Sequence, residues 1–188
     1  NLRQAEAPGL ALFSACFRAV LQGGELPQPA LADKAKQQGA TLIRPRIQVC
    51  ETDELMDARI LEALVSAKRH QTVAVLFPDS VTAVKVYKRL EVELRERMVE
   101  AELSEKVNLA RRHVRHFADV ANSKGLEFDV VLLAGVDQYD LSNSSHINRL
   151  YVGITRARQN LVLLSGTKTL APQLAEVRAV YQDLAGRP

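Results

Sequence analysis

The stretch ANSKGLEFDVVLLAG, residues 121–135, joins a polar turn to a long apolar run. The apolar half is typical of a strand that is buried on both faces of a parallel sheet. Lys124, Gly125 and Glu127 lie directly before it. An ammonium group attracts phosphate, a carboxylate accepts hydrogen bonds, and glycine adopts backbone conformations that are closed to other residues. A purely structural strand needs none of these, so the turn is a candidate binding site.

A second polar group precedes another apolar run, the segment NLVLLSG. Arg156 and Arg158 are two residues apart, so on a helix they point in different directions. Leu150, Ile154 and Ala157 would share the apolar face of the same helix. Taken alone, this pattern favours an arginine that interacts with the dipole at the C-terminal end of a helix.

Several kinds of chemistry are excluded by what the sequence lacks. There is no G-x-x-x-x-G-K-[ST] loop to cradle phosphates and no G-x-G-x-x-G fingerprint for a dinucleotide. No Ser-His-Asp or Cys-His arrangement is indicated. His113 and His116 are close in sequence, but no cysteine or carboxylate stands at ligand spacing from them. The sequence therefore predicts no metal site of its own.

The composition is that of a globular protein of 188 residues, with 47% hydrophobic and 25% charged residues. The net charge of +3 is a mild preference for anionic partners. Cys16 and Cys50 lie in apolar surroundings without paired spacing, which predicts reduced thiols. With no signal-peptide pattern and no membrane-length apolar run, we expect a cytoplasmic protein without membrane contact. The chain starts at NLRQAEAP without methionine, so we expect a fragment of a longer protein.

Hydrophobic periodicity predicts alternating helices and strands. Expected strands are 41–50, made imperfect by Pro45, and 72–77, 115–120, 128–136 and 160–166. Expected helices are 9–22, 53–69, one capped by Ser80 and running to about 104, 145–158 and 172–184. This alternation predicts an α/β fold with a mostly parallel sheet of about five strands and helices on both faces. Ligands in such sheets bind beyond the carboxyl ends of the strands.

Two motifs together suggest a family. SKGLEFDVVLLAG followed by RLYVGITRARQNLVLLSG closely resembles motifs V and VI of the UvrD/Rep-type superfamily 1 helicases. NLRQ at the start resembles motif IV, and VAVLFPDSVTAVKVYKRLE resembles the strand and helix that follow it. The family has two RecA-like domains with ATP between them, and the second carries motifs IV to VI. The resemblance implies that residues 1–188 form this second domain, a three-layer P-loop-NTPase-like sandwich without a P-loop.

The resemblance also implies roles for individual residues. Arg156 and Arg3 would reach across the cleft to the phosphates of ATP, where catalysis requires cations. Glu127 would accept a ribose hydroxyl, and Gly125 would keep the turn free of a side chain. Mg²⁺ would be held mainly by the N-terminal domain. Arg158 is expected at the surface or at a domain contact.

The other side of motif V faces DNA in the family. Backbone groups of the turn 119–125, with Asn122, Ser123 and Lys124, would contact single-stranded or partly duplex DNA. The sequence departs from the family here, because Asp119 and Ala121 replace the usual threonine and histidine. Leu2 also replaces the aromatic residue that stacks on adenine, and the large domain often inserted before motif V is absent.

Two functions are therefore compatible with the sequence. The first is the second motor domain of an ATP-dependent DNA helicase, which works with the N-terminal RecA-like domain of the same protein. The alternative is a non-catalytic RecA-like module with a binding or regulatory role. Translocation polarity, DNA or RNA preference and biological pathway do not follow from these motifs.

Overall fold

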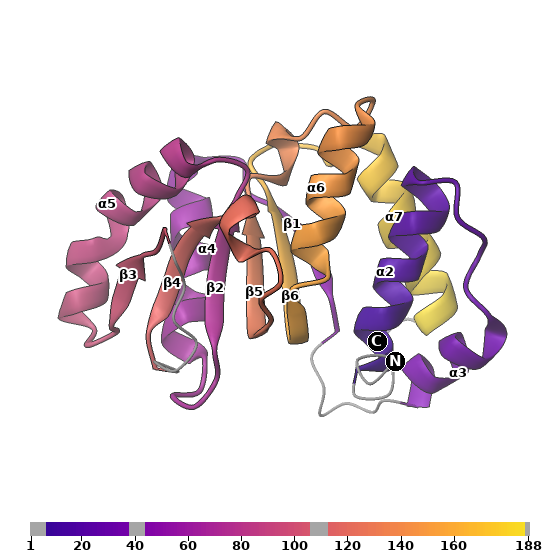
Figure 1. Ribbon diagram of the computed structural model, residues 1–188, viewed down its shortest axis with the longest axis horizontal. Coiled ribbons are helices and arrows are strands. Elements are labelled where there is room, and N and C mark those ends of the chain that lie inside the picture. Colours follow the sequence, from indigo (N-terminus) through magenta and orange to yellow (C-terminus); the bar gives the residue numbers. More distant parts are fainter. Residues whose placement is uncertain (1–6, 38–43, 106–112, 187–188) are drawn as a thin grey trace.

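The computed structural model describes residues 7–37, 44–105 and 113–186 (Figure 1). In these ranges one sheet has six strands, all parallel, in the order β1-β6-β5-β2-β4-β3. The strands are β1 Arg46–Val49, β2 Val73–Phe77, β3 Ala101–Leu103, β4 Arg115–Asp119, β5 Phe128–Ala134 and β6 Ala157–Ser165. The predicted α/β fold and parallel sheet are confirmed, with six strands where about five were expected.

Helices cover both faces of the sheet, which makes the three layers that were predicted (Figure 1). One face carries α4 Asp53–Ser66 and α5 Ser80–Glu96, and the other carries α2 Pro8–Leu21, α6 Ser144–Ile154 and α7 Pro172–Ala185. The remaining elements are α3 Pro29–Gln37, which packs on α2 and α7, and the 3-10 turns η1 Ala121–Ser123 and η2 Val136–Gln138. The core therefore consists of two apolar layers, one on each side of the sheet.

The alternation of side chains along each strand fills both layers. Leu161 and Leu163 of β6 belong to the cluster under α2, α6 and α7, whereas Val162 and Leu164 belong to the opposite cluster. All residues of β5 are buried, because this strand lies between β6 and β2 and beneath helices on both sides. The apolar half of the stretch 121–135 is thus a central strand, as its composition predicts.

The structure corrects the end of α5, which stops at Glu96 and not near 104. Met98 has a φ of 60°, and the N–H of Val99 donates to the carbonyl of Leu94 while that of Met98 donates to Arg95. These two bonds form a Schellman motif, in which the left-handed residue is usually glycine. Because a methionine fills this position, the sequence carries no stop signal, and the edge strand β3 was missed.

Smaller differences concern helix ends. The residue whose side chain caps α5 is Asp79, which accepts from the N–H of Thr82, and not Ser80. Helix α6 ends at Ile154, and Ala157 already pairs with Phe128 in the sheet. Ala157 is buried as predicted, but it lies on a strand and not on the helix face. Helix α3 was not expected, since only two of its alanines are buried.

Both cysteines are free and fully buried, in agreement with the prediction of reduced thiols. Burial raises the pKa of the Cys16 thiol to about 11. No helix in the described ranges is long and apolar enough to cross a membrane.

The raised pKa of Cys16 predicts a loss of stability at alkaline pH. The thiol ionises in the unfolded chain near pH 9 but stays protonated in the folded chain up to about 11. The unfolding free energy should therefore fall as pH rises through this window, by an amount on the order of 2 kcal/mol. Urea unfolding at alkaline and neutral pH measures it. Cys16→Val should reduce the dependence, and Cys50→Val is the matched control because Arg59 opposes the effect of burial on the pKa of Cys50. If the unfolding free energy of Cys16→Val depends on pH as strongly as that of wild type, Cys16 is not the source of the dependence.

Candidate nucleotide and DNA site

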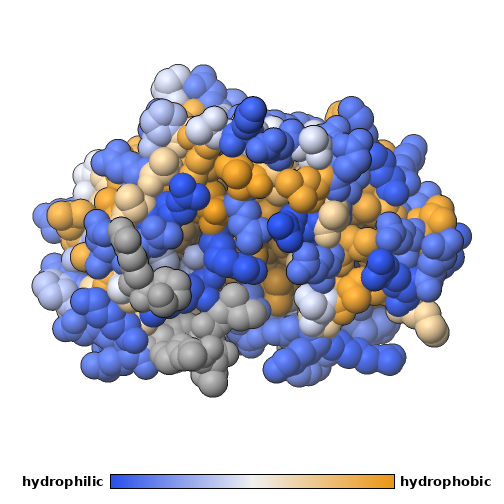
Figure 2. All heavy atoms as spheres, turned by 180° about the vertical axis from the view of Figure 1, so that it is seen from behind, coloured by the Kyte–Doolittle hydropathy of each residue, from blue (hydrophilic) through white to orange (hydrophobic). Residues whose placement is uncertain are grey.

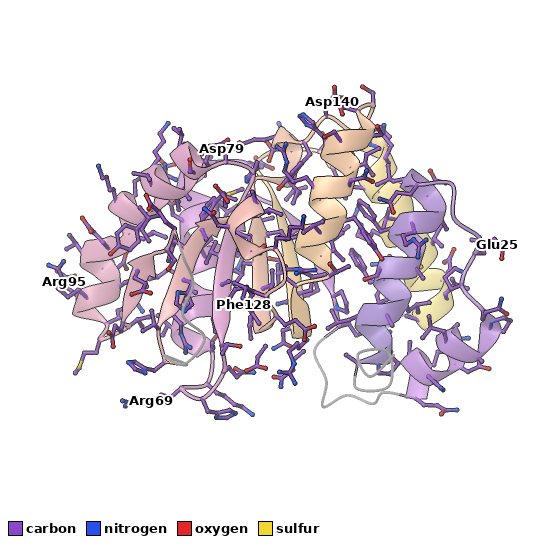
Figure 3. All side chains as sticks on the ribbon, in the orientation of Figure 1. Glu25, Arg69, Asp79, Arg95, Phe128 and Asp140 are labelled. Carbon is purple, nitrogen blue, oxygen red and sulfur yellow. The ribbon has the colours of Figure 1, made fainter. Side chains whose placement is uncertain are left out.

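The candidate residues surround the connection between β4 and β5, residues 120–127. Both strands are parallel members of one sheet, so this connection returns from the carboxyl edge to the amino edge. Glu127 consequently lies at the amino end of β5, and Arg156 lies at the amino end of β6. Figure 3 labels Phe128 at this edge and Asp79, which follows β2, at the opposite one. The general rule that ligands bind beyond the carboxyl ends of strands does not describe the position of these two residues, because both precede their strands.

The first half of the connection is a tightly bonded turn. Asp119 Oδ1 accepts from the N–H of Asn122 at 2.7 Å, and the Ser123 hydroxyl donates to the carbonyl of Val120 at 2.6 Å. Asp119 therefore bonds a backbone N–H within η1, which accounts for an acidic residue at this position. Ser123 is fully buried, so its hydroxyl is not presented to DNA in this conformation.

The next residues open the turn to solvent. Asn122 and Lys124 are exposed, as a contact with a large anionic ligand requires. Gly125 has a φ of 80°, and a Cβ placed on it would meet no atom within 4 Å. The prediction that glycine serves a backbone conformation here is confirmed, because side-chain-bearing residues rarely adopt this φ. The open space leaves room for a ligand beside the backbone.

Arg156 connects this turn to the end of α6. Its Nε donates to the carbonyl of Val152 at 3.1 Å, and its Nη1 approaches the carbonyl of Ser123 at 3.5 Å. Its Nη2 donates to Thr155 Oγ1 at 3.1 Å, and the Thr155 hydroxyl donates to Val152. The arginine thus satisfies a carbonyl at the helix C-terminus, as its position suggests, and it also contacts motif V.

Glu127 and Arg156 are held beside each other by the backbone. The N–H of Phe128, the residue after Glu127, donates to the carbonyl of Arg156 at 2.8 Å. On the other side of β5, Thr72 and Asp129 exchange two bonds, one from the N–H of Thr72 to Asp129 Oδ2 and one from the N–H of Asp129 to Thr72 Oγ1. Both partners are buried. The amino end of β5 is therefore fixed to both neighbouring strands.

A β-bulge in β6 places a further cation, Arg158, near Glu127. Phe128 pairs with Ala157 and Val130 with Asn160, so β6 has one residue more than β5 in this interval. Bulges re-aim side chains and are frequent beside functional sites. Here Arg158 Nε lies 3.9 Å from Glu127 Oε2, with both side chains partly exposed. Sequence reasoning placed Arg158 at the surface but missed this contact, since a bulge has no sequence signature.

Residues 116–164 match the family described as UvrD-like helicase C-terminal domain. The matched segment includes the connection 120–127, Glu127 and Arg156, which the structure brings together. The match covers 49 of the 188 residues, and it makes this segment similar to the C-terminal domain of UvrD-like helicases. No curated protein matches it.

Two solved structures are similar to this chain. One is the C-terminal domain of a possible DNA helicase from Lactobacillus plantarum, with 21% identity, a TM-score of 0.65 and coverage of 92% of each chain. The other is the Hef helicase domain of Pyrococcus furiosus, with 17% identity, a TM-score of 0.44 and coverage of 81% of this chain and 34% of that chain. The first supports the RecA-like fold over nearly the whole length.

Two sequence predictions lie outside the described residues. These are Arg3, the second predicted arginine, and Leu2, the replacement for an aromatic residue. Tyr151 and Thr155 lie just before Arg156. The ring of Tyr151 stacks on Phe17, with the guanidinium of Arg18 5.9 Å from the ring centre, and the hydroxyl of Thr155 accepts a bond from Arg156.

No group of three or more His, Cys, Asp or Glu residues suited to a metal ion occurs in the described part of the domain. The residues at the amino edge do fit a nucleotide. Two arginines offer donors for phosphate oxygens, a carboxylate offers an acceptor for a hydroxyl, and Gly125 leaves the approach open. The arrangement suits an anionic ligand with a sugar.

Proposed function

We propose that this domain is the second motor domain of an ATP-dependent superfamily 1 DNA helicase. It would complete an ATP site that is shared with an N-terminal RecA-like domain of the same protein and contact single-stranded DNA. The observation that carries the proposal is the shared position of Glu127 and Arg156 at one edge of the sheet, joined by the bond between Phe128 and Arg156. The family match over the same segment supports it.

The residues have complementary tasks in this proposal. Transfer of the γ-phosphoryl group spreads negative charge over its oxygens, and Mg²⁺ held by the N-terminal domain neutralises part of it. Arg156, with Arg3 from motif IV, supplies donors from this domain across the cleft. Glu127 accepts a hydroxyl of the ribose and so orients the nucleotide. Because the donors come from the second domain, hydrolysis requires the two domains to close.

The isolated chain tests whether ATP hydrolysis requires an N-terminal domain. We expect the 188 residues alone to hydrolyse no ATP, because the sequence has no P-loop. Adding an N-terminal RecA-like domain with Walker motifs, in the same chain, should produce hydrolysis that single-stranded DNA stimulates. The measurement is phosphate release with and without DNA. Failure of the joined protein to hydrolyse ATP would refute the proposal.

The DNA side is proposed to lie at the exposed residues Asn122 and Lys124. Lys124→Gln should weaken single-stranded DNA binding at low salt and lower the slope of log affinity against log salt by about 0.7, the value for one lost phosphate contact on a single strand. Fluorescence anisotropy over a salt series measures both quantities. Lys85→Gln is the matched control, since Lys85 is exposed on α5. An identical slope for Lys124→Gln and wild type would remove Lys124 from the interface.

One observation favours the alternative of a non-catalytic module. The guanidinium of Arg156 already bonds Val152 and Thr155 within its own domain. A decayed domain that kept Arg156 only for its structural bonds would have the same contacts. This alternative predicts a joined protein that binds DNA or protein partners but shows no DNA-stimulated hydrolysis.

A further inference from the structure

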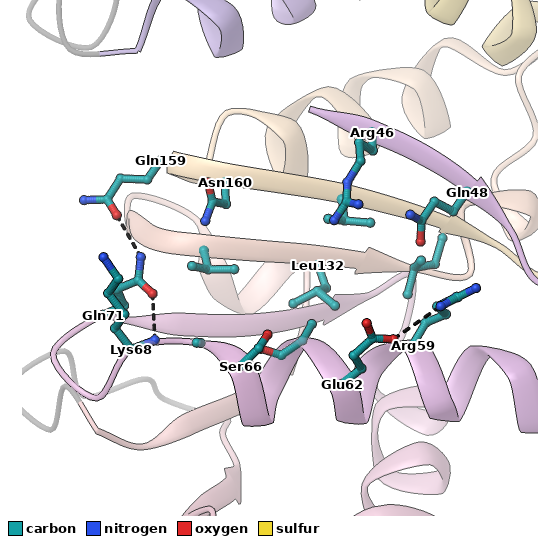
Figure 4. Close-up of a pocket in the computed structure, with 15 residues that line it drawn as sticks. Arg46, Gln48, Arg59, Glu62, Ser66, Lys68, Gln71, Leu132, Gln159 and Asn160 are labelled. Carbon is teal, nitrogen blue, oxygen red and sulfur yellow. Dashed lines mark hydrogen bonds and ion pairs between the residues drawn. The ribbon is translucent and has the colours of Figure 1, made fainter. Parts of the chain in front are cut away.

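A trough of about 370 Å³ lies between α4 and the strands β1, β5 and β6 (Figure 4). It is on the sheet face opposite α2, α6 and α7, and no residue of the connection 120–127 lines it. Its floor consists of the aliphatic side chains Val130, Leu132, Val162 and Leu164. Its rim is polar, with Arg46, Gln48, Arg59, Glu62, Ser66, Lys68, Gln71, Gln159 and Asn160.

The sequence of β1 and β6 explains why this face is open. Arg46 and Gln48 alternate with the buried Ile47, so the outer face of β1 is polar while its inner face packs in the core. Asn160 continues the polar face on β6. Figure 2 views this side of the molecule, where hydrophilic and hydrophobic residues meet around a hollow. The helices leave this part of the sheet face uncovered, although both faces of a parallel sheet are usually covered.

The charges of the trough select an anionic ligand. Three cations line it, Arg46, Arg59 and Lys68, against one carboxylate, Glu62. Glu62 Oε2 lies 3.3 Å from Arg59 Nη1, so its charge is already offset by one of the cations. Arg46 projects from β1 over the floor, where no such carboxylate is paired with it among the described residues (Figure 4). The remaining field is positive.

The other polar groups indicate a peptide. Two amide side chains of the lining, Gln48 and Asn160, offer donors and acceptors together, as a peptide backbone requires. Gln71 and Gln159 also line the trough, but they are bonded to each other, with 3.0 Å from Gln71 Nε2 to Gln159 Oε1. None of the lining residues is aromatic, and bases of single-stranded nucleic acid are held mainly by stacking on aromatic rings.

We propose that this trough binds an extended acidic peptide segment of a partner protein. An aliphatic side chain of the peptide lies on the floor formed by Val130 and Val162, and its carboxylates face Arg46 and Lys68. The amides of Gln48 and Asn160 bond its backbone. The proposal is independent of the ATP site, so the failure of one leaves the other standing.

The amides of Gln48 and Asn160 report directly on whether the trough is occupied. We would add the capped peptide Glu-Asp-Leu-Glu-Glu-Leu-Asp to the ¹⁵N-labelled chain and follow the side-chain NH₂ signals by NMR. The signals of Gln48 and Asn160 should shift and saturate with a dissociation constant on the order of 0.1–1 mM. The same peptide with Gln and Asn in place of Glu and Asp should cause no comparable shift.

Three variants distinguish an effect of charge on peptide binding from a loss of folding. Arg46→Gln should weaken binding about tenfold, because a hydrogen bond to a charged group is lost. Arg95→Gln removes the same charge from the exposed outer part of α5 and should change nothing. Glu62→Gln removes the repelling carboxylate and should tighten binding by roughly two- to fivefold. A gain of affinity in Glu62→Gln cannot come from misfolding.

Two results would overturn the proposal. One is the absence of shifts at Gln48 and Asn160 with peptide at about ten times the expected dissociation constant. The other is a short oligothymidylate that shifts the same signals, depends on Arg46 and binds more tightly than the peptide, which would assign the trough to nucleic acid.

Discussion

Arg156→Ala in the protein that joins this domain to its N-terminal RecA-like domain is expected to lower DNA-stimulated ATP turnover about a thousandfold. The substitution removes the donors that we propose for the γ-phosphoryl group, and these act mainly when charge develops during transfer. ATP affinity should change little, since most phosphate contacts belong to the other domain. Steady-state turnover, together with equilibrium binding of a labelled nucleotide, measures the two effects separately.

Structural loss must be distinguished from catalytic loss in this variant. Arg156 also bonds the carbonyl of Val152 and the hydroxyl of Thr155, so Arg156→Ala should lower the melting temperature as well. Arg156→Lys keeps the charge but not the planar fork of donors, and it should remain severely impaired. Arg149→Ala is the matched control, because Arg149 is an exposed arginine on α6, the helix that precedes Arg156. Turnover near wild type in folded Arg156→Ala would show that Arg156 is structural only.

The largest expected effect on stability comes from Arg115, a buried cation on β4. It is 5% exposed, and its Nη1 donates to the carbonyl of Gln71 at 3.0 Å. Its Nη2 donates to the carbonyls of Ala67 at 2.9 Å and Lys68 at 3.2 Å. These carbonyls follow the last turn of α4, where a helix leaves acceptors without partners. Burial lowers the pKa of Arg115, since the guanidinium gives up water.

Arg115→Met should therefore reduce the unfolding free energy by an amount on the order of 3 kcal/mol, because the carbonyls of Ala67 and Gln71 lose the guanidinium donor and that of Lys68 keeps only the N–H of Gln71. Urea unfolding followed by circular dichroism measures the change. Arg95→Met removes an exposed arginine from α5 and should stay within about 0.5 kcal/mol of wild type. Equal stability of Arg115→Met and wild type would mean that water replaces the guanidinium at no cost.

The sequence predicted most of the fold because its strands are strongly apolar and its helices strongly periodic. β5 and β6 are buried by their composition, and neither depends on an unusual local conformation. The wrong predictions concern the end of α5, the strand β3 and the residue that caps α5. Met98 occupies a left-handed position that favours glycine, which hid the end of α5 and the strand β3. Asp79, one residue before the predicted cap Ser80, has the carboxylate in position to bond Thr82.

The candidate site was predicted in part. The motifs located Gly125, Glu127 and Arg156, and the structure brings these residues to one edge of the sheet. The sequence did not show which edge of the sheet this would be. The rule that ligands bind beyond the carboxyl ends of strands does not cover Glu127 and Arg156, which precede their strands. Ser123 was predicted to face DNA, yet burial is a property of three-dimensional packing that a polar residue type does not show. The bulge that aims Arg158 at Glu127 depends on strand register, which no local pattern reveals.

The connection 120–127 runs between the two edges of the sheet and contains no long helix. Its first part is fixed by the bonds of Asp119 and Ser123, and its last part is fixed where Phe128 enters the sheet. Gly125 stands between these two anchored parts and is the one glycine of the segment. Backbone rotation costs least at this residue. The connection is thus held at both ends, with Gly125 as the residue between them where the backbone rotates most easily, and Arg156 contacts it on both sides of Gly125, at the carbonyl of Ser123 and the N–H of Phe128.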